Sequence, residues 1–389
     1  MNNRFLISVI GLNSILFLNY FFWAIFPPNE YLAQALIIIY VVICLYSLKN
    51  LREVWPLVAF ILFGMLVTIF TGSEAWDARS IWLFHGKRIF FDNNLYAQLD
   101  NYLPSSHNDY PVLFSAFVAT LARATGVWNE VFPKSASIFF LIPPLLIILK
   151  VISNTTLFLL FNIGLVKICN DFLFNGYMDA ILALYTCAAI FLLMPFVLEG
   201  TDLAGKSKQI YVALVGSFLV ALPLLKNEGL VILLCISVAS LLFKPLLSKK
   251  TYILVLLVAL LFFFFSWKLP LMFANLQNDM EVPGGLGRAL KRTMDIDSLN
   301  LIASCIIKNV WIYLTLLVVS LFAVQIKFSK INIPTIFLIL YLVALLFVYF
   351  MTPHDLTWHL GLSINRTLMP INLLMLGITI LIIKNHKYL

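Results

Sequence analysis

The stretch Thr71–Pro111, TGSEAWDARSIWLFHGKRIFFDNNLYAQLDNYLPSSHNDYP, is the longest polar interval of the chain and separates two strongly apolar segments. Its charged and histidine residues are Glu74, Asp77, Arg79, His85, Lys87, Arg88, Asp92, Asp100, His107 and Asp109. A charged side chain is costly inside a hydrocarbon layer, so charges beside apolar segments are candidates for function. We therefore expect this interval to hold a catalytic carboxylate at a membrane surface.

The chain around this interval is too apolar for a water-soluble domain. Of its 389 residues, 62% are hydrophobic and only 11% are charged, whereas soluble domains carry about 25% charged residues. Unbroken apolar runs of about 20 residues, rather than alternating strands of about ten, predict transmembrane helices. The expected fold class is an all-α polytopic membrane protein. The net charge of +8 is explained by Lys and Arg in cytoplasmic loops, so we expect no nucleic-acid partner.

The apolar runs predict about twelve transmembrane helices in a single transmembrane domain, residues 1–389. The predicted spans are residues 5–26, 31–48, 55–71, 133–152, 155–170, 177–198, 209–225, 228–243, 251–269, 301–323, 333–351 and 368–384. The first run is too long for the core of a signal peptide, so we expect a retained helix.

The distribution of cations predicts the orientation of these helices. With the N-terminus inside, the inner segments hold thirteen of the 26 Lys and Arg residues but only three of the 18 acidic residues. Because cytoplasmic loops are enriched in Lys and Arg, both termini are expected in the cytoplasm. The polar interval Thr71–Pro111 then faces outward.

Two predicted outer loops are long. Residues 72–132 include Tyr110–Gly126, an apolar segment that we interpret as an interfacial helix, because a further span would put the cation-rich loops outside. Residues 270–300 contain Pro283, three glycines and three cations. This composition is typical of a mobile turn whose cations meet lipid headgroups or a phosphate. An ordinary solvated connector explains it as well.

The five cysteines lie singly in or beside apolar segments, without the spacing of a metal or redox motif, so we expect packing residues. A divalent metal held by His107, Asp109, His354 and His359 is conceivable, but no ligand spacing requires it. We therefore expect no cofactor.

Four predicted outer connections carry polar residues that a simple loop does not require. They are Asp77 with its loop, Asp179, the turn Lys226-Asn227-Glu228 and the segment Thr352–Arg366. Each has a plainer alternative. Asp179 would be favoured by the dipole at the start of a helix, and Lys226 and Glu228 would pair at a turn. Gathered on one side, however, they predict a site open to the outside.

The last of these segments contains a conspicuous cation. If it is helical, His359, Ser363 and Arg366 share one face. Arg366 has no local acid to neutralise it, so an anionic phosphate is an attractive partner. In the opening interval, AWDARSIWLFHGKRIFF predicts an in-plane helix with Asp77 and Arg88 on one side. The alternative is an in-plane amphipathic helix whose charged side chains only face water.

Taken together, these motifs resemble the GT-C superfamily of membrane glycosyltransferases, which use a sugar carried on polyprenyl phosphate. The bacterial members similar to protein mannosyltransferases and aminoarabinose transferases are closest in style. The resemblance covers the chain from Trp55 onward and leaves residues 1–50 as two additional N-terminal helices. It rests on Glu74-Ala-Trp-Asp77, His107-Asn-Asp-Tyr-Pro111, Asn175-Gly-Tyr-Met-Asp179, Lys226-Asn-Glu-Gly229, and Trp358-His-Leu with Ser363 and Arg366.

The resemblance implies an inverting transfer at the outer face of a bacterial inner membrane. It assigns the catalytic base to Asp77, with Glu74 as the alternative, and a second acidic role to Asp179. The partners expected are a polyprenyl-phosphate-linked sugar donor, membrane lipid, and a lipid, glycan or protein acceptor. The substrate-binding candidates are His107, Asp109, Glu228 and His359.

One motif departs from the family pattern. Several relatives open the interfacial helix with Lys-Pro-Pro, whose lysine meets the donor phosphate, and the matching positions here are Asp109-Tyr110-Pro111. The candidate phosphate ligands are therefore Arg366, Lys87, Lys226 and Arg88. Lys87 lies about 15 Å along a continuous helix from Asp77 and would reach the same ligand only if Gly86 broke that helix. Arg366 is therefore preferred.

Two other functions fit the same residues. A transporter or flippase of a lipid-linked sugar would use the outer polar groups as a gate, but we detect no internal repeat and no charge clearly at mid-membrane depth. In a non-catalytic scaffold the same charges would have no chemical task.

Overall fold

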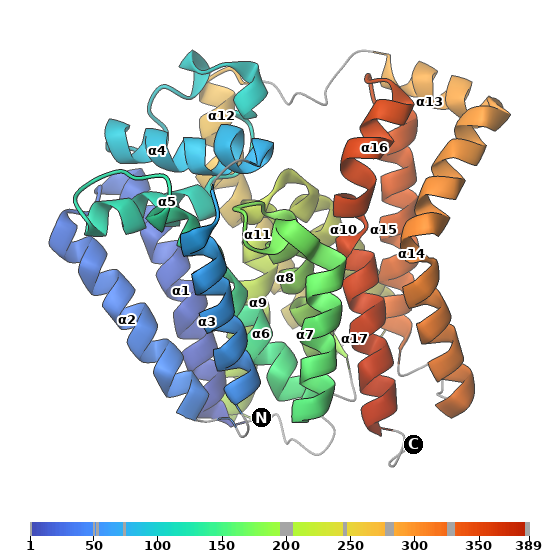
Figure 1. The fold of residues 1–389 in the computed structure, drawn as a ribbon, viewed down its shortest axis with the longest axis horizontal. Coiled ribbons are helices and arrows are strands. Elements are labelled where there is room, and N and C mark those ends of the chain that lie inside the picture. The colour runs from blue at the N-terminus through green and yellow to red at the C-terminus, as the bar shows by residue number, and fades with distance from the viewer. Residues whose placement is uncertain are drawn as a thin grey trace.

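The computed structural model describes residues 2–49, 51, 54–72, 75–194, 205–243, 247–276, 284–324 and 331–385. Within them, all regular structure is helical, which confirms the all-α fold class (Figure 1). Glu74 and Pro283 lie outside the described residues. The α-helices are α1 (Asn3–Ile25), α2 (Glu30–Lys49), α3 (Trp55–Phe70), α4 (Leu83–Asp92), α5 (Leu113–Ala124), α6 (Ala136–Ile152), α7 (Thr155–Cys169), α8 (Asp179–Leu193), α9 (Gly205–Leu225), α10 (Asn227–Leu242), α11 (Lys249–Phe263), α12 (Leu269–Phe273), α13 (Gly285–Met294), α14 (Ile296–Val324), α15 (Asn332–Met351), α16 (Leu356–Thr367) and α17 (Met369–Asn385).

Nine helical segments among the described residues are long and apolar enough to cross a membrane. Each of the twelve predicted spans falls on a helix, but three fall on helices of 15 or 16 residues, α3, α8 and α10, that no adjoining helical turn lengthens to a full span. About 20 residues are needed to cross the hydrocarbon core. The structure therefore supports a multi-pass membrane protein with nine candidate spans, fewer than the twelve predicted.

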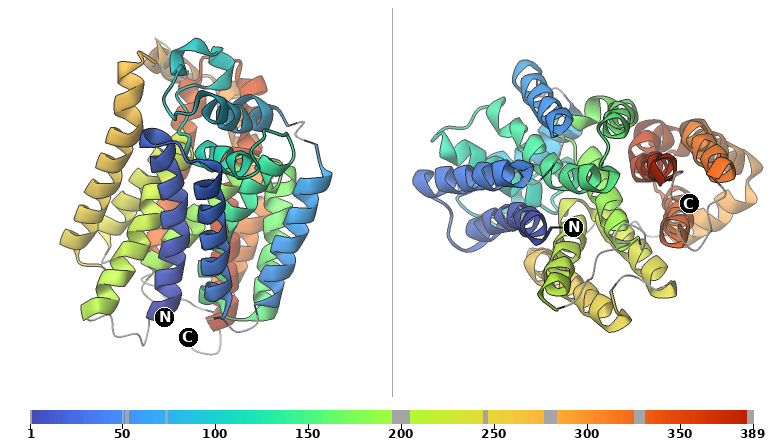
Figure 2. Two further views of the ribbon diagram at one scale, coloured as in Figure 1. Left: turned by 90° about the vertical axis from the view of Figure 1, so that its left-hand side faces the viewer. Right: turned by 90° about the horizontal axis from the view of Figure 1, so that it is seen from below.

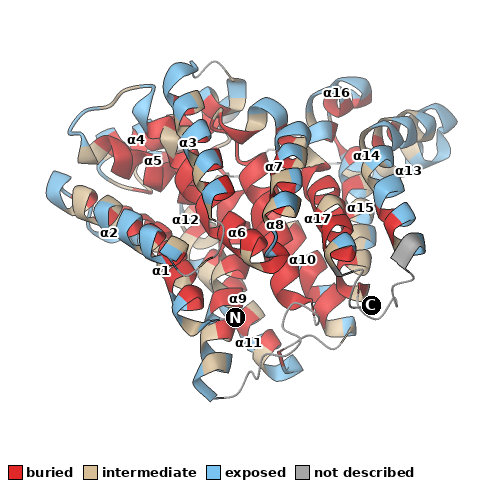
Figure 3. Cartoon of the chain, turned by 60° about the horizontal axis from the view of Figure 1, so that its bottom comes forward, coloured by how far each residue is buried: buried red, intermediate tan, exposed pale blue. Residues whose placement is uncertain are grey.

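Helices α6 and α8 form the centre of the bundle (Figure 3). Every residue of α8 is buried, from Asp179 to Leu193. Helix α1 also packs into this core: the Tyr185 hydroxyl donates a hydrogen bond to Asn13 Oδ1 at 2.9 Å. The first two helices therefore include a part of the core and not only a peripheral addition.

Helices α4, α5 and α13 lie across one end of the bundle, and the start of α1 and the end of α17 lie at the other (Figure 1). Seen along the bundle, α14, α15 and α17 gather on one side (Figure 2). Helix α5 has twelve residues, and all of its residues from Leu113 to Ala122 are buried. It is too short to cross a membrane, and protein covers it on nearly every side.

The helix predicted after Asp77 is present and does not break at Gly86. It begins with a π-helical turn, Ala78–Trp82, and continues as α4 to Asp92. A Cβ atom at Gly86 would lie 2.4 Å from Val118 Cγ1, so the glycine is required for the close packing of α4 on α5. The break that would have brought Lys87 toward Asp77 is absent.

Candidate active site

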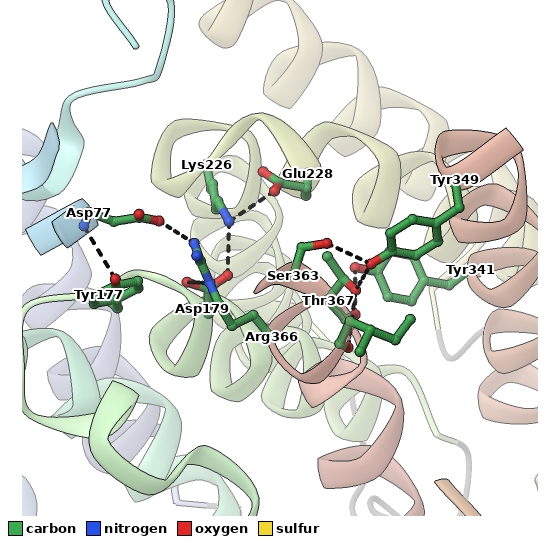
Figure 4. A network of polar contacts seen from close by, with 11 residues as sticks. Asp77, Tyr177, Asp179, Lys226, Glu228, Tyr341, Tyr349, Ser363, Arg366 and Thr367 are labelled. Carbon is green, nitrogen blue, oxygen red and sulfur yellow. Dashed lines mark hydrogen bonds and ion pairs between the residues drawn. The ribbon is translucent and has the colours of Figure 1, made fainter. Parts of the chain in front are cut away.

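Five charged side chains from four separate segments form one continuous network (Figure 4). Arg366 forms ion pairs with Asp77 and, at 3.2 Å, with Asp179. Lys226 Nζ lies 2.8 Å from Asp179 Oδ1 and 2.9 Å from Glu228 Oε1. The structure thus brings together residues that lie up to 289 positions apart in the chain.

The network is shielded from water at its centre. Asp179 and Lys226 are each 4% exposed, and the side chains of Asp77 and Arg366 are 18% and 16% exposed. The cavity between Asp179, Lys226 and Arg366 measures about 10 Å³, which is room for at most about one water molecule. This space is too small to hold a phosphate group between the three side chains as they stand.

The turn before α8 positions both Asp179 and Tyr177. Gly176 has φ +92°, a left-handed conformation that glycine adopts without strain. The Tyr177 hydroxyl then accepts a hydrogen bond from the backbone N–H of Asp77 at 3.2 Å, and its ring centroid lies 4.7 Å from the Arg366 guanidinium carbon. Tyr177 therefore supports the Asp77–Arg366 pair from both sides.

The turn between α9 and α10 presents Lys226 and Glu228. A Cβ atom at Gly229 would lie 1.8 Å from the carbonyl oxygen of Leu222, so only glycine allows the two helices to approach this closely. Burial lowers the pKa of Lys226, but the carboxylates of Asp179 and Glu228 raise it more, and the net shift is upward. Lys226 is thus a buried, stably charged ammonium group.

Arg366 lies in α16, so its predicted helical face with His359 and Ser363 exists. The expectation that no acid neutralises Arg366 is wrong in three dimensions, because Asp77 and Asp179 approach it from two other segments. Asp355, the acid nearest in the same segment, instead caps α16 by accepting from the backbone N–H of Trp358 at 2.8 Å.

A second polar group borders the network through the residue between Lys226 and Glu228. Asn227 Nδ2 donates to Asp109 Oδ2 at 2.8 Å, and the Asp109 carbonyl accepts from the Trp267 indole at 3.0 Å. The next ring, that of Tyr110, is stacked against His107 at 4.8 Å between centroids. Asp109 and His107 therefore lie beside the network and outside its ion pairs.

A groove of about 390 Å³ opens beside Glu228. Its polar lining includes Asn227, Glu228 and Lys268, and its other walls are mainly apolar, including Phe263 and Phe347. Glu228 Oε2 is buried and has no hydrogen-bond partner among the described residues. The groove therefore has Glu228 among a few polar lining residues, and the rest of its lining is mainly apolar.

Two predicted phosphate ligands lie elsewhere. Lys87 is on the exposed side of α4 and pairs with Glu130 at 3.2 Å. Arg88 is buried and donates to the carbonyls of Leu95 and Ala97, each at 2.8 Å. These contacts give Lys87 a surface position and Arg88 a role in holding its own loop.

The remaining candidates are also outside the network. His359 is buried in α16, with its ring centroid 5.2 Å from that of Tyr349. In the described part of the chain, no three His, Cys, Asp or Glu side chains are close enough to hold a metal ion, so the alternative of a metal held by His107, Asp109, His354 and His359 gains no support. All five cysteines are free, and only Cys305 is not fully buried.

Two residues of the site were missed in the sequence. Tyr177 lies inside the motif Asn175–Asp179, where its position two residues before the acid was an available signal. Lys134 is buried and donates to Thr71 Oγ1 at 3.0 Å and to the Gly72 carbonyl at 3.2 Å. It fixes the end of α3, from which the chain leads to Asp77, and nothing in the sequence indicated that contact.

The chain matches no family model, no curated protein and no solved structure.

Proposed function

We propose that the protein is an inverting glycosyltransferase that moves a sugar from a polyprenyl-phosphate carrier to a hydroxyl group of a lipid, glycan or protein. The observation that carries this proposal is the network in which one arginine, Arg366, joins the carboxylates of Asp77 and Asp179. In the same proposal the chain crosses a bacterial inner membrane twelve times with both termini in the cytoplasm, and the network faces outward.

Asp77 is the general base of the proposed reaction. It removes the proton of the acceptor hydroxyl as that oxygen forms a bond to the anomeric carbon of the sugar. The bond between the anomeric carbon and the phosphate oxygen breaks, and polyprenyl phosphate leaves with the electron pair. The partial exposure of Asp77, in contrast to the deep burial of Asp179, suits a carboxylate that must meet an acceptor.

Arg366 and Lys226 stabilise the charge that develops on the leaving phosphate. Without substrate, both cations are neutralised by carboxylates. In this proposal the donor phosphate replaces Asp77 on Arg366, and the same exchange frees Asp77 to act as the base. Lys226, Asp179 and Glu228 keep the position of the site during this exchange.

The groove beside Glu228 suits the rest of the donor. Its apolar walls include residues that are open to the outside of the bundle, such as Phe347, which is 57% exposed. An isoprenoid chain would lie along these walls, and the Glu228 and Asn227 side chains in the lining would accept hydrogen bonds from, and donate them to, sugar hydroxyls.

The test is transfer by the purified protein with a panel of radiolabelled polyprenyl-phosphate sugars and a membrane extract as the source of acceptors. Asp77→Asn should lower the rate of sugar loss from the carrier by about 10²–10⁴-fold, the range expected for a general base. The matched control is Asp92→Asn. This carboxylate at the end of α4 accepts a hydrogen bond from the Tyr102 hydroxyl at 3.1 Å and lies 4.0 Å from Arg88, outside the network.

Three outcomes would contradict parts of the proposal. Full turnover by Asp77→Asn would remove Asp77 as the base. An unmutated protein that is inactive with every donor, yet carries a labelled lipid-linked sugar across a vesicle membrane, would be a transporter. Loss of activity in Asp92→Asn to the same extent would show that the effect is not particular to the network.

A further inference from the structure

Helix α13 presents an apolar side that no part of the described structure covers. Leu286, Leu290 and Met294 follow one another at intervals of four, which places them on one face of the helix. Their exposed fractions are 73%, 62% and 85%, and α13 contains no buried residue.

The charged side of the same helix faces the protein. Arg292 donates to the carbonyls of Thr352 at 2.8 Å and Tyr349 at 3.0 Å, and Arg288 donates to the carbonyl of Met351 at 3.0 Å. These carbonyls lie at the end of α15, where a helix has no internal donors for them. The two arginines therefore hold α13 against the end of α15.

This arrangement is the reverse of that in a helix on a water-soluble protein. At about 100° per residue, Arg288 and Arg292 lie roughly 160° to 200° around the helix from Leu290. A helix packed against a soluble core turns its apolar side inward and its charges outward. Here the charges point inward and the apolar side points outward, so the surroundings of α13 must be apolar.

The position of α13 indicates what those surroundings are. The helix lies across the end of the bundle beside α14 and α15 (Figure 1). Helix α14 follows it directly, is a candidate membrane span, and exposes large apolar side chains along its length, including Ile307, Trp311 and Phe322. The apolar face of α13 is thus followed in the chain by a candidate span that also exposes apolar side chains.

We propose that α13 lies in the plane of the membrane and inserts Leu286, Leu290 and Met294 among the acyl chains of the leaflet next to α4 and α16. The exposed Lys291, about 100° around the helix from Leu290, then lies at the level of the lipid phosphates. This membrane contact is independent of the proposed transfer reaction.

The experiment places an environment-sensitive NBD label on Leu290→Cys and, as the matched control, on Lys291→Cys. The background carries Cys305→Ala, because the other four native cysteines are buried. The labelled protein is reconstituted in vesicles of phosphatidylcholine and phosphatidylglycerol. Quenching is measured with acyl-chain-brominated phosphatidylcholine and, separately, with iodide in the water.

The label at position 290 should be quenched by brominated lipid at least about twofold more strongly than the label at position 291, and iodide should show the opposite order. Leu286→Cys should repeat the result for position 290. Equal access of iodide to both positions would overturn the proposal in favour of a water-exposed helix. Protection of position 290 from both quenchers would overturn it in favour of a second protein copy on this face.

Discussion

Arg88 and Arg366 are two partly or fully buried arginines near the same end of the bundle, and they differ in what accepts their hydrogen bonds. Arg88 donates to backbone carbonyls of the loop that follows α4, and its one carboxylate neighbour among the described residues, Asp92 of the same helix, lies 4.0 Å away. Arg366 pairs with two side-chain carboxylates from other segments. A carbonyl cannot leave without unfolding its loop, whereas a carboxylate can be exchanged for a phosphate. The partner of a buried cation therefore separates a structural role from a role in binding.

The largest effect on the transfer rate is expected when Arg366, which pairs with Asp77 and Asp179, is replaced. Arg366→Gln should lower the rate of sugar transfer by about 10²–10³-fold, because the charge on the leaving phosphate loses its main stabilising group. The measurement is the single-turnover rate with a saturating labelled donor. A variant that changes only the KM for the donor would place Arg366 in ground-state binding and contradict its role in stabilising the leaving phosphate.

A double-variant cycle checks the link between Arg366 and Asp77. Arg366→Gln leaves Asp77 without its cation, and Asp77→Asn in the same chain removes that uncompensated charge. The two stability changes should therefore differ from additivity by about 0.5–3 kcal/mol, as expected for residues in contact. Additive changes in the thermal unfolding of the purified variants would show that the pair is not formed in the protein.

Replacing Arg88, in contrast to Arg366, should lower stability and leave the transfer rate nearly unchanged. Arg88→Met leaves the carbonyls of Leu95 and Ala97 without donors, at a cost of about 1–3 kcal/mol for each buried group. We expect a lower Tm in detergent, while the rate per folded molecule stays within about threefold of the unmutated protein, since the remaining general-base and phosphate groups are intact. A normal Tm with a large loss of donor affinity would instead show that Arg88 binds the donor phosphate.

The sequence placed the network residues among the candidates because each lies at a polar break between apolar runs on one predicted side. It did not show that Asp77 and Asp179 would neutralise Arg366, because that pairing depends on how α8 and α16 pack. Lys87 and Arg88 are neighbours in the sequence and were both candidates. They separate only when α4 turns one toward solvent and the other inward. The catalytic assignment itself stays a prediction.

The predicted number of spans shows a similar limit. Hydropathy reports that a segment avoids water but not whether lipid or protein surrounds it. Helix α8 is apolar because protein encloses it, and it begins only at Asp179, after the turn at Gly176. The turn at Lys226 likewise separates α9 from the 16-residue helix α10. Polar motifs at the ends of the runs therefore shorten the helices that a hydropathy count treats as full spans.

His85 gives a pH-dependent effect in the region of Arg88. Burial, assisted by the charge of Arg88, lowers the pKa of His85 from 6.5 to about 3, so the folded protein holds this ring neutral. Below pH 6.5 the unfolded chain takes up a proton that the folded protein refuses. The free energy of unfolding should therefore fall by about 1.4 kcal/mol per pH unit between pH 6.5 and 3.

The measurement compares the pH dependence of Tm in detergent for the unmutated protein and His85→Gln. The Tm of His85→Gln should fall less steeply with decreasing pH than the Tm of the unmutated protein. The variant should therefore gain stability relative to the unmutated protein as the pH falls. Parallel curves for the two proteins over this range would mean that His85 takes up its proton in the folded state as well.

The smallest effect is expected at Lys87, where the comparison of cations is easiest to overturn. Lys87 is 47% exposed and its partner Glu130 is 55% exposed, and such surface pairs contribute about 0–1 kcal/mol. Lys87→Gln should therefore change Tm by no more than a few degrees and leave both kcat and the KM for the donor within about twofold, since a solvated cation outside the network stabilises neither substrate nor leaving group. The comparison needs the kinetics of Lys87→Gln and Arg366→Gln in the same preparation of lipid. A loss of donor affinity in Lys87→Gln that approaches the loss in Arg366→Gln would show that α4 turns toward the donor when the donor binds. Cations that bind the phosphate would then have to be distinguished from structural cations in the donor-bound protein.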